Sequence, residues 1–256
     1  MEHYITISGA NIWTIIHDEL ADSQKPFLLM CGGGPGVNDG LNEMDPLLNE
    51  YFNTIRFNTR GCGTSTADKN YSIETVINDI EEIRKYFNVE KWYILGHSWG
   101  ANIALFYALE HPEHCERIVY LCGLGVQNDM DWSEECARHA AEQTEPERPP
   151  RQGVDDTMNY EVLDVQIHSF HKYIQKPMLL RQIATLPIPV CVMCGRLDIR
   201  PMWPAIQLAN LLPYGKLLIF EECGHFPWVT HPEQVKSSVL DWVHDGKYGI
   251  YLSEIN

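Results

Sequence analysis

The chain has 256 residues, 45% of them hydrophobic and 21% charged, which is the ordinary balance of a globular protein with a sizeable core. Its formal net charge of −16 repels nucleic-acid phosphates and anionic membranes, so we expect no nucleic-acid and no membrane partner. No apolar run approaches the roughly 20 residues that span a bilayer, and the start lacks a signal-peptide pattern, so we predict a cytoplasmic protein.

Strand and helix signals alternate through the first half of the chain. Two short alternating runs, Tyr4–Ile7 and Asn11–His17, predict an antiparallel hairpin. Continuous apolar runs then predict buried strands, and the helical spacing of apolar residues after Ser72, a suitable N-cap, predicts a helix. In chain order these elements are strands at 27–31 and 52–58, a helix at 73–87, a strand at 92–95, a helix at 99–109 and a strand at 117–122.

The same alternation returns near the C-terminus, with strands at 188–193 and 216–221 and helices at 204–212 and 232–243. Such a rhythm predicts an α/β protein with a mostly parallel sheet of about eight strands and helices on both faces. Residues 124–185 interrupt it with helical patches and a polar, proline-rich connection at 144–151. We therefore expect a core domain formed by residues 1–123 and 186–256, and a small helical lid at 124–185.

The eight cysteines do not indicate a disulfide framework or a metal site. Cys191 and Cys194 form a CxxC within a predicted strand, where residues three apart point to opposite faces. We interpret both as buried small hydrophobic residues. No HExxH or clustered His/Cys spacing appears, so we expect neither a metal nor a cofactor.

The segment Gly96-His97-Ser98-Trp99-Gly100 matches the G-x-S-x-G pattern. It follows a predicted strand and opens a predicted helix, which is where a nucleophile elbow lies. The turn is tight and strained, and the flanking glycines avoid clashes between strand and helix. Ser98 is therefore the predicted nucleophile.

A serine hydroxyl needs a positioned base, and the expected chain order is serine, acid, histidine. His225 follows the last predicted strand within Cys223-Gly224-His225, and Asp198 follows the preceding strand. We predict His225 as the base and Asp198 as the carboxylate that orients it. The oxyanion donors are expected from the amide of Trp99 and from the loop Gly32–Gly36, with Gly34 favoured and Gly33 next.

These motifs resemble the proline iminopeptidase-like branch of the α/β-hydrolase fold. Gly33-Gly34-Pro35-Gly36 is similar to that family's HGGPG loop, Arg60–Ser65 to its DQRGxGxS segment, and Gly96–Gly100 to its GxSWG elbow. Gly32 stands where the family has His, and Asn58-Thr59 replace its Asp-Gln. Ile199 occupies the place of a Glu that some members use to hold the substrate amine.

The resemblance implies a substrate with a free N-terminus, hence a carboxylate near the pocket. Asn159-Tyr160-Glu161 is weakly similar to a cap segment that supplies one, so Glu161 is the first candidate. Aromatic residues beside the triad or in the lid are candidates for an apolar substrate pocket, namely Trp132, Phe226 and Trp228.

The leading interpretation is a serine hydrolase, of the prolyl aminopeptidase type, that acts on small peptides or amides. One alternative is a carboxylesterase or C–C bond hydrolase with the same catalytic residues. Another is a low-turnover ligand-binding or receptor protein of the same fold. A small molecule or small peptide is the expected partner, and the oligomeric state and the role of segment 246–256 are left open.

Overall fold

The computed structural model describes residues 1–17, 24–126, 130–142 and 157–244. The predicted connection at 144–151 and the C-terminal segment 246–256 lie outside the described residues. Within them, one eight-stranded sheet forms the centre of the molecule. Its strands are β1 (Glu2–Ile7), β2 (Ala10–Ile16), β3 (Phe27–Cys31), β4 (Asn53–Phe57), β5 (Trp92–His97), β6 (Cys115–Leu121), β7 (Val190–Gly195) and β8 (Gly215–Phe220).

The strand order across the sheet is β1-β2-β4-β3-β5-β6-β7-β8. The hairpin of β1 and β2 is antiparallel and joins β4 in antiparallel register, whereas all remaining neighbours from β4 to β8 pair in parallel. The predicted parallel sheet with an antiparallel edge is confirmed. Because the central strands are parallel, their carboxyl ends meet at one edge, where open α/β sheets bind ligands.

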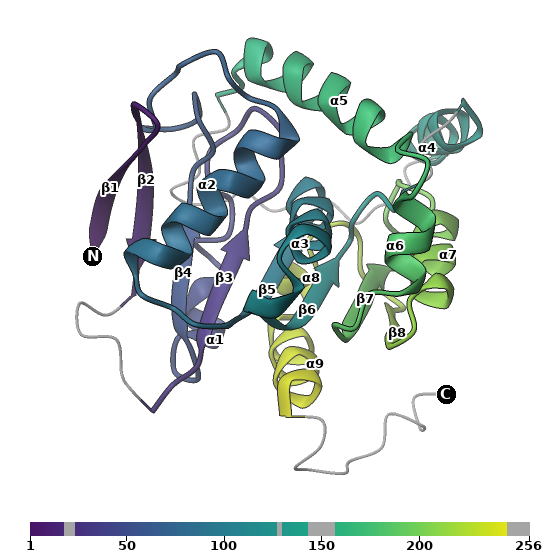
Figure 1. The fold of residues 1–256 in the computed structure, drawn as a ribbon. Helices are drawn as coiled ribbons and strands as arrows, with labels where there is room; N and C mark the ends of the chain where they lie inside the picture. The colour runs from purple at the N-terminus through teal and green to yellow at the C-terminus, as the bar shows by residue number, and fades with distance from the viewer. Residues whose placement is uncertain (18–23, 127–129, 143–156, 245–256) are drawn as a thin grey trace.

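Helices cover both faces of this sheet (Figure 1). Helices α2, α3, α5, α6 and α7 contribute to the apolar core on one face, and α1, α8 and α9 to the core on the other. Helices α4, α5 and α6 fall between β6 and β7 in the chain, within the predicted lid. The helices are α1 (Asp45–Leu48), α2 (Ile73–Tyr86), α3 (Trp99–Glu110), the 3₁₀ turn Pro112–His114, α4 (Met130–Glu142), α5 (Tyr160–Ile174), α6 (Leu179–Ala184), α7 (Trp203–Leu211), α8 (Pro227–Thr230) and α9 (Pro232–His244).

Local signals account for the ends of α2. The Ser72 hydroxyl accepts a hydrogen bond from the Thr75 amide at 3.2 Å, which satisfies one of the free N–H groups of the first turn. Glu74 lies in that first turn, whereas Arg84 and Lys85 lie in the last, where each charge complements the helix dipole.

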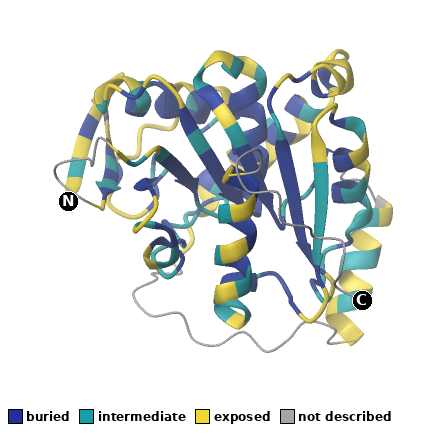
Figure 2. Cartoon of the chain, turned by 90° about the horizontal axis from the view of Figure 1, so that it is seen from below, coloured by how far each residue is buried: buried dark blue, intermediate teal, exposed yellow. Residues whose placement is uncertain are grey.

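Strand β7 shows how sequence alternation divides the two cores. Cys191 and Met193 enter the core beneath α9, whereas Val192 and Cys194 enter the core beneath α3 and α7. Both cysteines are buried and neither forms a disulfide, so the interpretation of the CxxC as two small hydrophobic residues on opposite faces is confirmed. Figure 2 shows the central strands buried and the outer helices exposed on one side.

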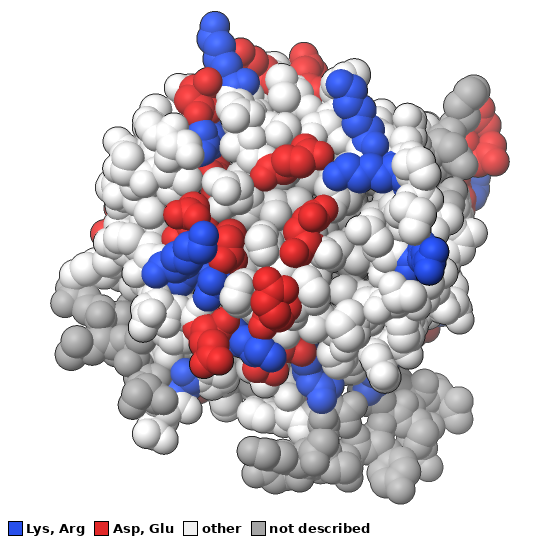
Figure 3. All heavy atoms as spheres, in the orientation of Figure 1, with Lys and Arg blue, Asp and Glu red and all other residues white. Residues whose placement is uncertain are grey.

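On the face shown in Figure 3, acidic and basic side chains are interspersed rather than gathered into one field. Ion pairs between exposed side chains include Lys85 with Glu82 and Lys176 with Glu74. None of the helices described by the structure combines the length and apolar character that crossing a bilayer requires.

Candidate active site

Ser98 lies at the turn between β5 and α3, at the carboxyl edge of the sheet. Its backbone has φ 56° and ψ −121°, a conformation that non-glycine residues rarely adopt and that costs free energy. The Ser98 amide donates to the carbonyl of Leu121 at 2.8 Å, which ties the turn to β6. A Cβ on Gly96 would lie 2.2 Å from the Gly100 carbonyl oxygen, so the tight turn requires glycine. These features are those of a nucleophile elbow.

Asp198 and His225 meet on the loops that follow β7 and β8, two neighbouring strands. Nδ1 of His225 lies 2.5 Å from Oδ2 of Asp198, and both side chains are buried. A Cβ on Gly195 would lie 2.2 Å from the Gly224 carbonyl oxygen, so glycine permits the close approach of the two loops. The structure thus brings the predicted acid and base together in the orientation that fixes the imidazole.

Asp198 is surrounded by groups that favour its charged form. Burial by itself would raise the pKa of this carboxyl group, but the charge and hydrogen bond of His225 and the charge of Arg200 outweigh it and hold the pKa below the usual range. Oδ1 accepts from the Arg200 guanidinium at 3.0 Å and from the Arg200 amide at 2.9 Å. Sequence reasoning missed Arg200, although its position two residues after an acid is typical of an Asx turn.

His97 is a second residue that sequence reasoning missed. Its ring is buried, and its Nε2 atom lies 2.8 Å from the carbonyl oxygen of His225. Since a carbonyl only accepts, Nε2 carries the proton and donates it. The rings of His97 and His225 lie 4.7 Å apart between centroids. The x position of G-x-S-x-G therefore contacts the loop of the predicted base.

The glycine-rich loop after β3 approaches the elbow closely. A Cβ on Gly33 would lie 3.4 Å from Cβ of Ser98 and 3.0 Å from Nδ1 of His97. Gly34 has φ +145°, which L side chains rarely adopt. Of the two glycines predicted to supply the second oxyanion donor, Gly33 is the one whose Cβ would lie near the Ser98 side chain.

Buried polar contacts hold this loop in place. The Asp39 amide donates to Oδ1 of Asn58 at 2.5 Å, and Arg56 forms ion pairs with Asp39 and, at 3.1 Å, with Asp45. Ser65 Oγ donates to the carbonyl of Asn58 at 2.9 Å. Asn58, which replaces an Asp of the similar family, therefore links the glycine-rich loop to the Arg60–Ser65 segment.

The predicted substrate-binding residues lie in different surroundings. Phe226 is half-buried and packs edge-on against His225, with ring centroids 5.0 Å apart. Trp228 is buried against His97, and Trp132 is half-buried on α4. Glu161 is exposed in the first turn of α5, at a hollow that it shares with Gly61–Gly63. Phe226 thus has a partly accessible side chain in contact with the predicted base.

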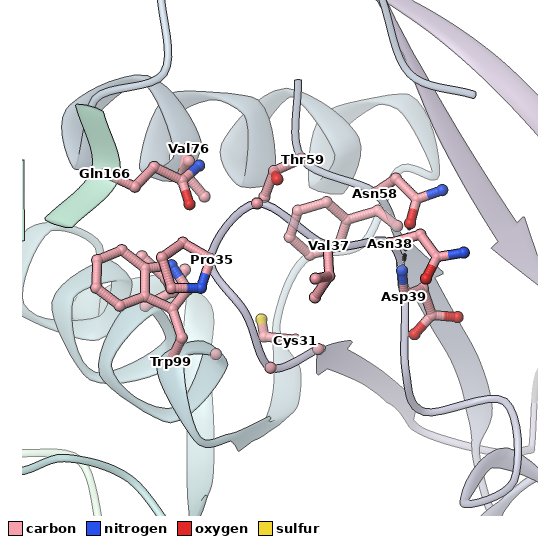
Figure 4. A pocket seen from close by; sticks show the side chains of 16 residues that line it. Cys31, Pro35, Val37, Asn38, Asp39, Asn58, Thr59, Val76, Trp99 and Gln166 are labelled. Carbon is pink, nitrogen blue, oxygen red and sulfur yellow. Dashed lines mark hydrogen bonds between the residues drawn. The ribbon is translucent and has the colours of Figure 1, made fainter. Parts of the chain in front are cut away.

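A small pocket lies beside the elbow, between the glycine-rich loop, α2, α3 and α5 (Figure 4). Its walls include Trp99 and Gly100 from the start of α3, and Pro35 from the loop. Gln166 reaches it from α5. It begins next to the two segments that are expected to supply the oxyanion donors, so it is a candidate for part of the substrate site.

Three potential metal ligands approach one another in the described part of the chain: the ligand atoms of Cys122, Asp198 and His225 lie within 4.8 Å of one another. Burial raises the pKa of the Cys122 thiol well above its ordinary value, so the thiolate that a metal requires is disfavoured. Asp198 and His225 are already bonded to each other. This chemistry fits a catalytic acid–base pair better than a metal centre.

Known proteins resemble this chain in sequence and in fold. Residues 26–145 match a family model described as alpha/beta hydrolase fold. A putative proline iminopeptidase of Mycoplasma genitalium is 36% identical over 114 residues, which cover 43% of this chain but only 36% of that relative. A proline iminopeptidase of Lactobacillus helveticus is 23% identical over 277 residues, covering 87% of this chain and 92% of the relative.

Among solved structures, a hydrolase from Pseudomonas aeruginosa PA01 superposes with a TM-score of 0.76 at 19% identity, covering 94% of this chain and 98% of the other. At that identity the likeness concerns the fold. This structural likeness and the family model together confirm the predicted α/β-hydrolase fold. The sequence relatives confirm the predicted resemblance to proline iminopeptidases.

Proposed function

We propose that this chain, which resembles α/β hydrolases in fold and in sequence, is a serine hydrolase that acts by acyl transfer. Ser98, His225 and Asp198 are the proposed triad. The observation that carries the proposal is the 2.5 Å contact between His225 and Asp198 at the sheet edge where Ser98 occupies a strained elbow. A serine without a function does not require a strained backbone conformation, which costs free energy and is typical of functional sites.

In the proposed reaction, Oγ of Ser98 attacks a substrate carbonyl carbon while His225 accepts the hydroxyl proton. The ionised Asp198 stabilises the imidazolium that forms, and its lowered pKa supports this role. His225 then returns the proton to the leaving group, and an acyl-enzyme remains. Water, deprotonated by His225, attacks that ester and releases Ser98.

The amide of Trp99 and an amide of the loop Gly33–Gly34 are the proposed donors to the tetrahedral oxyanion. A Cβ on Gly33 would lie 3.4 Å from Cβ of Ser98, and this close approach supports a place for the loop beside the reacting carbonyl. Two such donors, fixed before the reaction begins, stabilise charge that develops only in the transition state.

The proposed substrate is a small peptide or amide with a free N-terminus, since the relatives are named as proline iminopeptidases. Glu161 stays the proposed carboxylate for the amine, and Trp132, Phe226 and Trp228 stay the proposed aromatic lining. Segment 124–185 is the proposed lid over residues 1–123 and 186–256. A cytoplasmic location is part of the same proposal.

Labelling by a fluorophosphonate, followed by intact-mass measurement, tests the triad. We expect one adduct on the wild type, none on Ser98→Ala, and strongly slowed labelling of His225→Gln. Ser133→Ala, on α4, is the matched control and should label as the wild type does. An unlabelled wild type would contradict the proposal and favour the low-turnover binding protein.

A substrate panel tests the finer assignment. Proline p-nitroanilide is compared with short-chain p-nitrophenyl esters on the wild type and on Ser98→Ala. We expect anilide turnover that Ser98→Ala abolishes. Ester turnover without anilide turnover would instead assign the chain to the carboxylesterases, with the same triad.

A further inference from the structure

The pocket beside the elbow contains polar atoms that have no hydrogen-bond partner among the described residues. Both Oε1 and Nε2 of Gln166 are of this kind, and so is Nε1 of Trp99. Gln166 is only 1% exposed and Trp99 only 4%. Buried polar groups are almost always paired, because an unpaired one loses its bonds to water without compensation. With Oδ1 of Asn38, four such atoms belong to residues that line this pocket, which indicates that something else pairs with them.

The position of Gln166 on α5 makes it exceptional. The buried residues of this helix are Val162, Gln166, Phe170 and Tyr173, which follow one face at helical spacing. The other three pack in apolar surroundings or donate a hydrogen bond, as Tyr173 does to Glu110 at 2.9 Å. An apolar residue of similar size would fill the same place without an unpaired amide. A role in ligand recognition therefore explains the buried Gln166 amide better than helix packing does.

Helix α5 holds Gln166 firmly over the pocket. The Asn159 amide donates to the Gly36 carbonyl at 2.7 Å, and its Nδ2 donates to the Gly61 carbonyl at 2.9 Å. The Phe170 ring lies 5.3 Å from that of Trp99. The start of α5 is thus fixed on the glycine-rich loop and at Gly61, and its C-terminal half packs on Trp99. Figure 4 shows the Gln166 amide facing the pocket from above Pro35.

We propose that Gln166 and the indole of Trp99 form a subsite for a neutral carboxamide on the acyl side chain of the substrate. The inference rests on the proposed acyl-transfer function. The pocket starts beside Gly33 and Trp99, the segments assigned to the substrate carbonyl. A side chain on the carbon next to that carbonyl therefore reaches it. The asparaginyl side chain is long enough to place its amide in the pocket.

The hydrogen-bonding groups match a carboxamide. Its oxygen accepts from Nε2 of Gln166 and Nε1 of Trp99, and its NH₂ donates to Oε1 of Gln166. The charge of the pocket agrees, because Asp39, its acidic lining residue, is already paired with Arg56. Apolar walls such as Val76 and Ile103 favour a neutral group over an ion.

Calorimetric binding to Ser98→Ala protein tests the subsite without turnover. The probes are asparaginyl and leucyl p-nitroanilide, whose side chains have nearly the same shape and differ in the amide. We expect the asparaginyl compound to bind about 10- to 100-fold more tightly. Adding Gln166→Leu should abolish the preference, because the new side chain keeps the volume and loses the amide. Gln166→Met replaces it if the leucine variant fails to fold.

Thr59→Val is the matched control. Thr59 lines the same pocket, but its hydroxyl already donates to Cys62 Sγ at 3.3 Å, so the ligand preference should persist. Equal binding of the two probes, or a preference that survives Gln166→Leu, would overturn the subsite and leave the pocket with ordered water only. Labelling of the wild-type serine is measured in parallel. If Ser98 is labelled but the two probes bind equally, the subsite alone is refuted. If the asparaginyl probe binds more tightly but Ser98 is not labelled, the catalytic proposal alone is refuted.

Discussion

The Nε2 atom of His97 donates a hydrogen bond to the main-chain carbonyl of His225 across 2.8 Å, which joins the elbow to the loop of the proposed base. His97 precedes the proposed nucleophile directly in the chain. One hydrogen bond thus connects two segments that are 128 residues apart. We regard His97 as a positioning residue, since it acts on His225 through the backbone.

His97→Phe should keep the ring packing and lose this hydrogen bond. We expect the fluorophosphonate labelling rate to fall by about 100-fold, because a displacement of about 1 Å at a catalytic group has an effect of that size. The exposed His168→Phe variant serves as the control for the substitution itself. A His97→Phe protein that labels at the wild-type rate would show that the loop of His225 is held by other contacts.

Arg200→Gln should raise the pKa of Asp198, because it removes one of the cations that oppose the effect of burial. The carboxylate is then protonated at a higher pH, so the acidic limb of the labelling rate against pH should move to higher pH. We expect a loss of about tenfold at neutral pH. Arg196→Gln is the matched control, since Arg196 lies on the same loop as Arg200 but pairs with the exposed Glu221. An unmoved acidic limb in Arg200→Gln would contradict the electrostatic role.

Gly100→Ala should prevent stable folding. A Cβ at this position would lie 2.1 Å from the Cys31 carbonyl oxygen, a backbone atom that cannot move without disrupting β3, so we expect a cost above about 4 kcal/mol. Gly32→Ala is the contrast, because its nearest neighbour would be 3.4 Å away, and its cost should stay within about 1 kcal/mol. Urea unfolding of the two variants measures the difference. Equal stabilities would contradict this account of the glycine contacts.

Glu81 should make folding sensitive to acid. Burial opposes its charge, but hydrogen bonds from Arg84 and Tyr107 and the nearby charges lower its pKa to about 2. Its carboxylate therefore stabilises the fold above the unfolded pKa of about 4.5, and this contribution is lost as the pH falls from there towards 2. We expect Glu81→Gln to lower the free energy of unfolding by about 2 kcal/mol at pH 7 and by less at pH 3.

Urea unfolding at pH 7, 4.5 and 3 measures that dependence. Glu82→Gln is the control, because its carboxylate is exposed and pairs only with Lys85 among the ion pairs found in the described residues. Its free energy of unfolding should change by less than about 0.5 kcal/mol at each pH. If Glu81→Gln lowers the free energy of unfolding equally at all three pH values, the effect is due to the shape of the side chain rather than to its charge.

Regular elements were predictable because their signals are local. The strand at 27–31 is observed with the same bounds, the helix capped by Ser72 begins where predicted, and the other predicted strands and helices end within a few residues of the observed ones. By contrast, α1 and α8 were not predicted. Each has four residues, too few for a helical period to appear in the sequence.

The sequence by itself determined the fold class, the elbow at Ser98 and the loops that bear Asp198 and His225, because apolar periodicity and glycine positions specify strands, helices and the turns between them. Only the tertiary structure decided that Arg200 and His97 contact the acid and the base, and that Gln166 faces a pocket. Those contacts depend on strand order and on how α5 docks. The sequence pattern around a residue predicts whether it is buried or exposed. The residue that it contacts lies in another part of the chain, and tertiary packing determines which one it is.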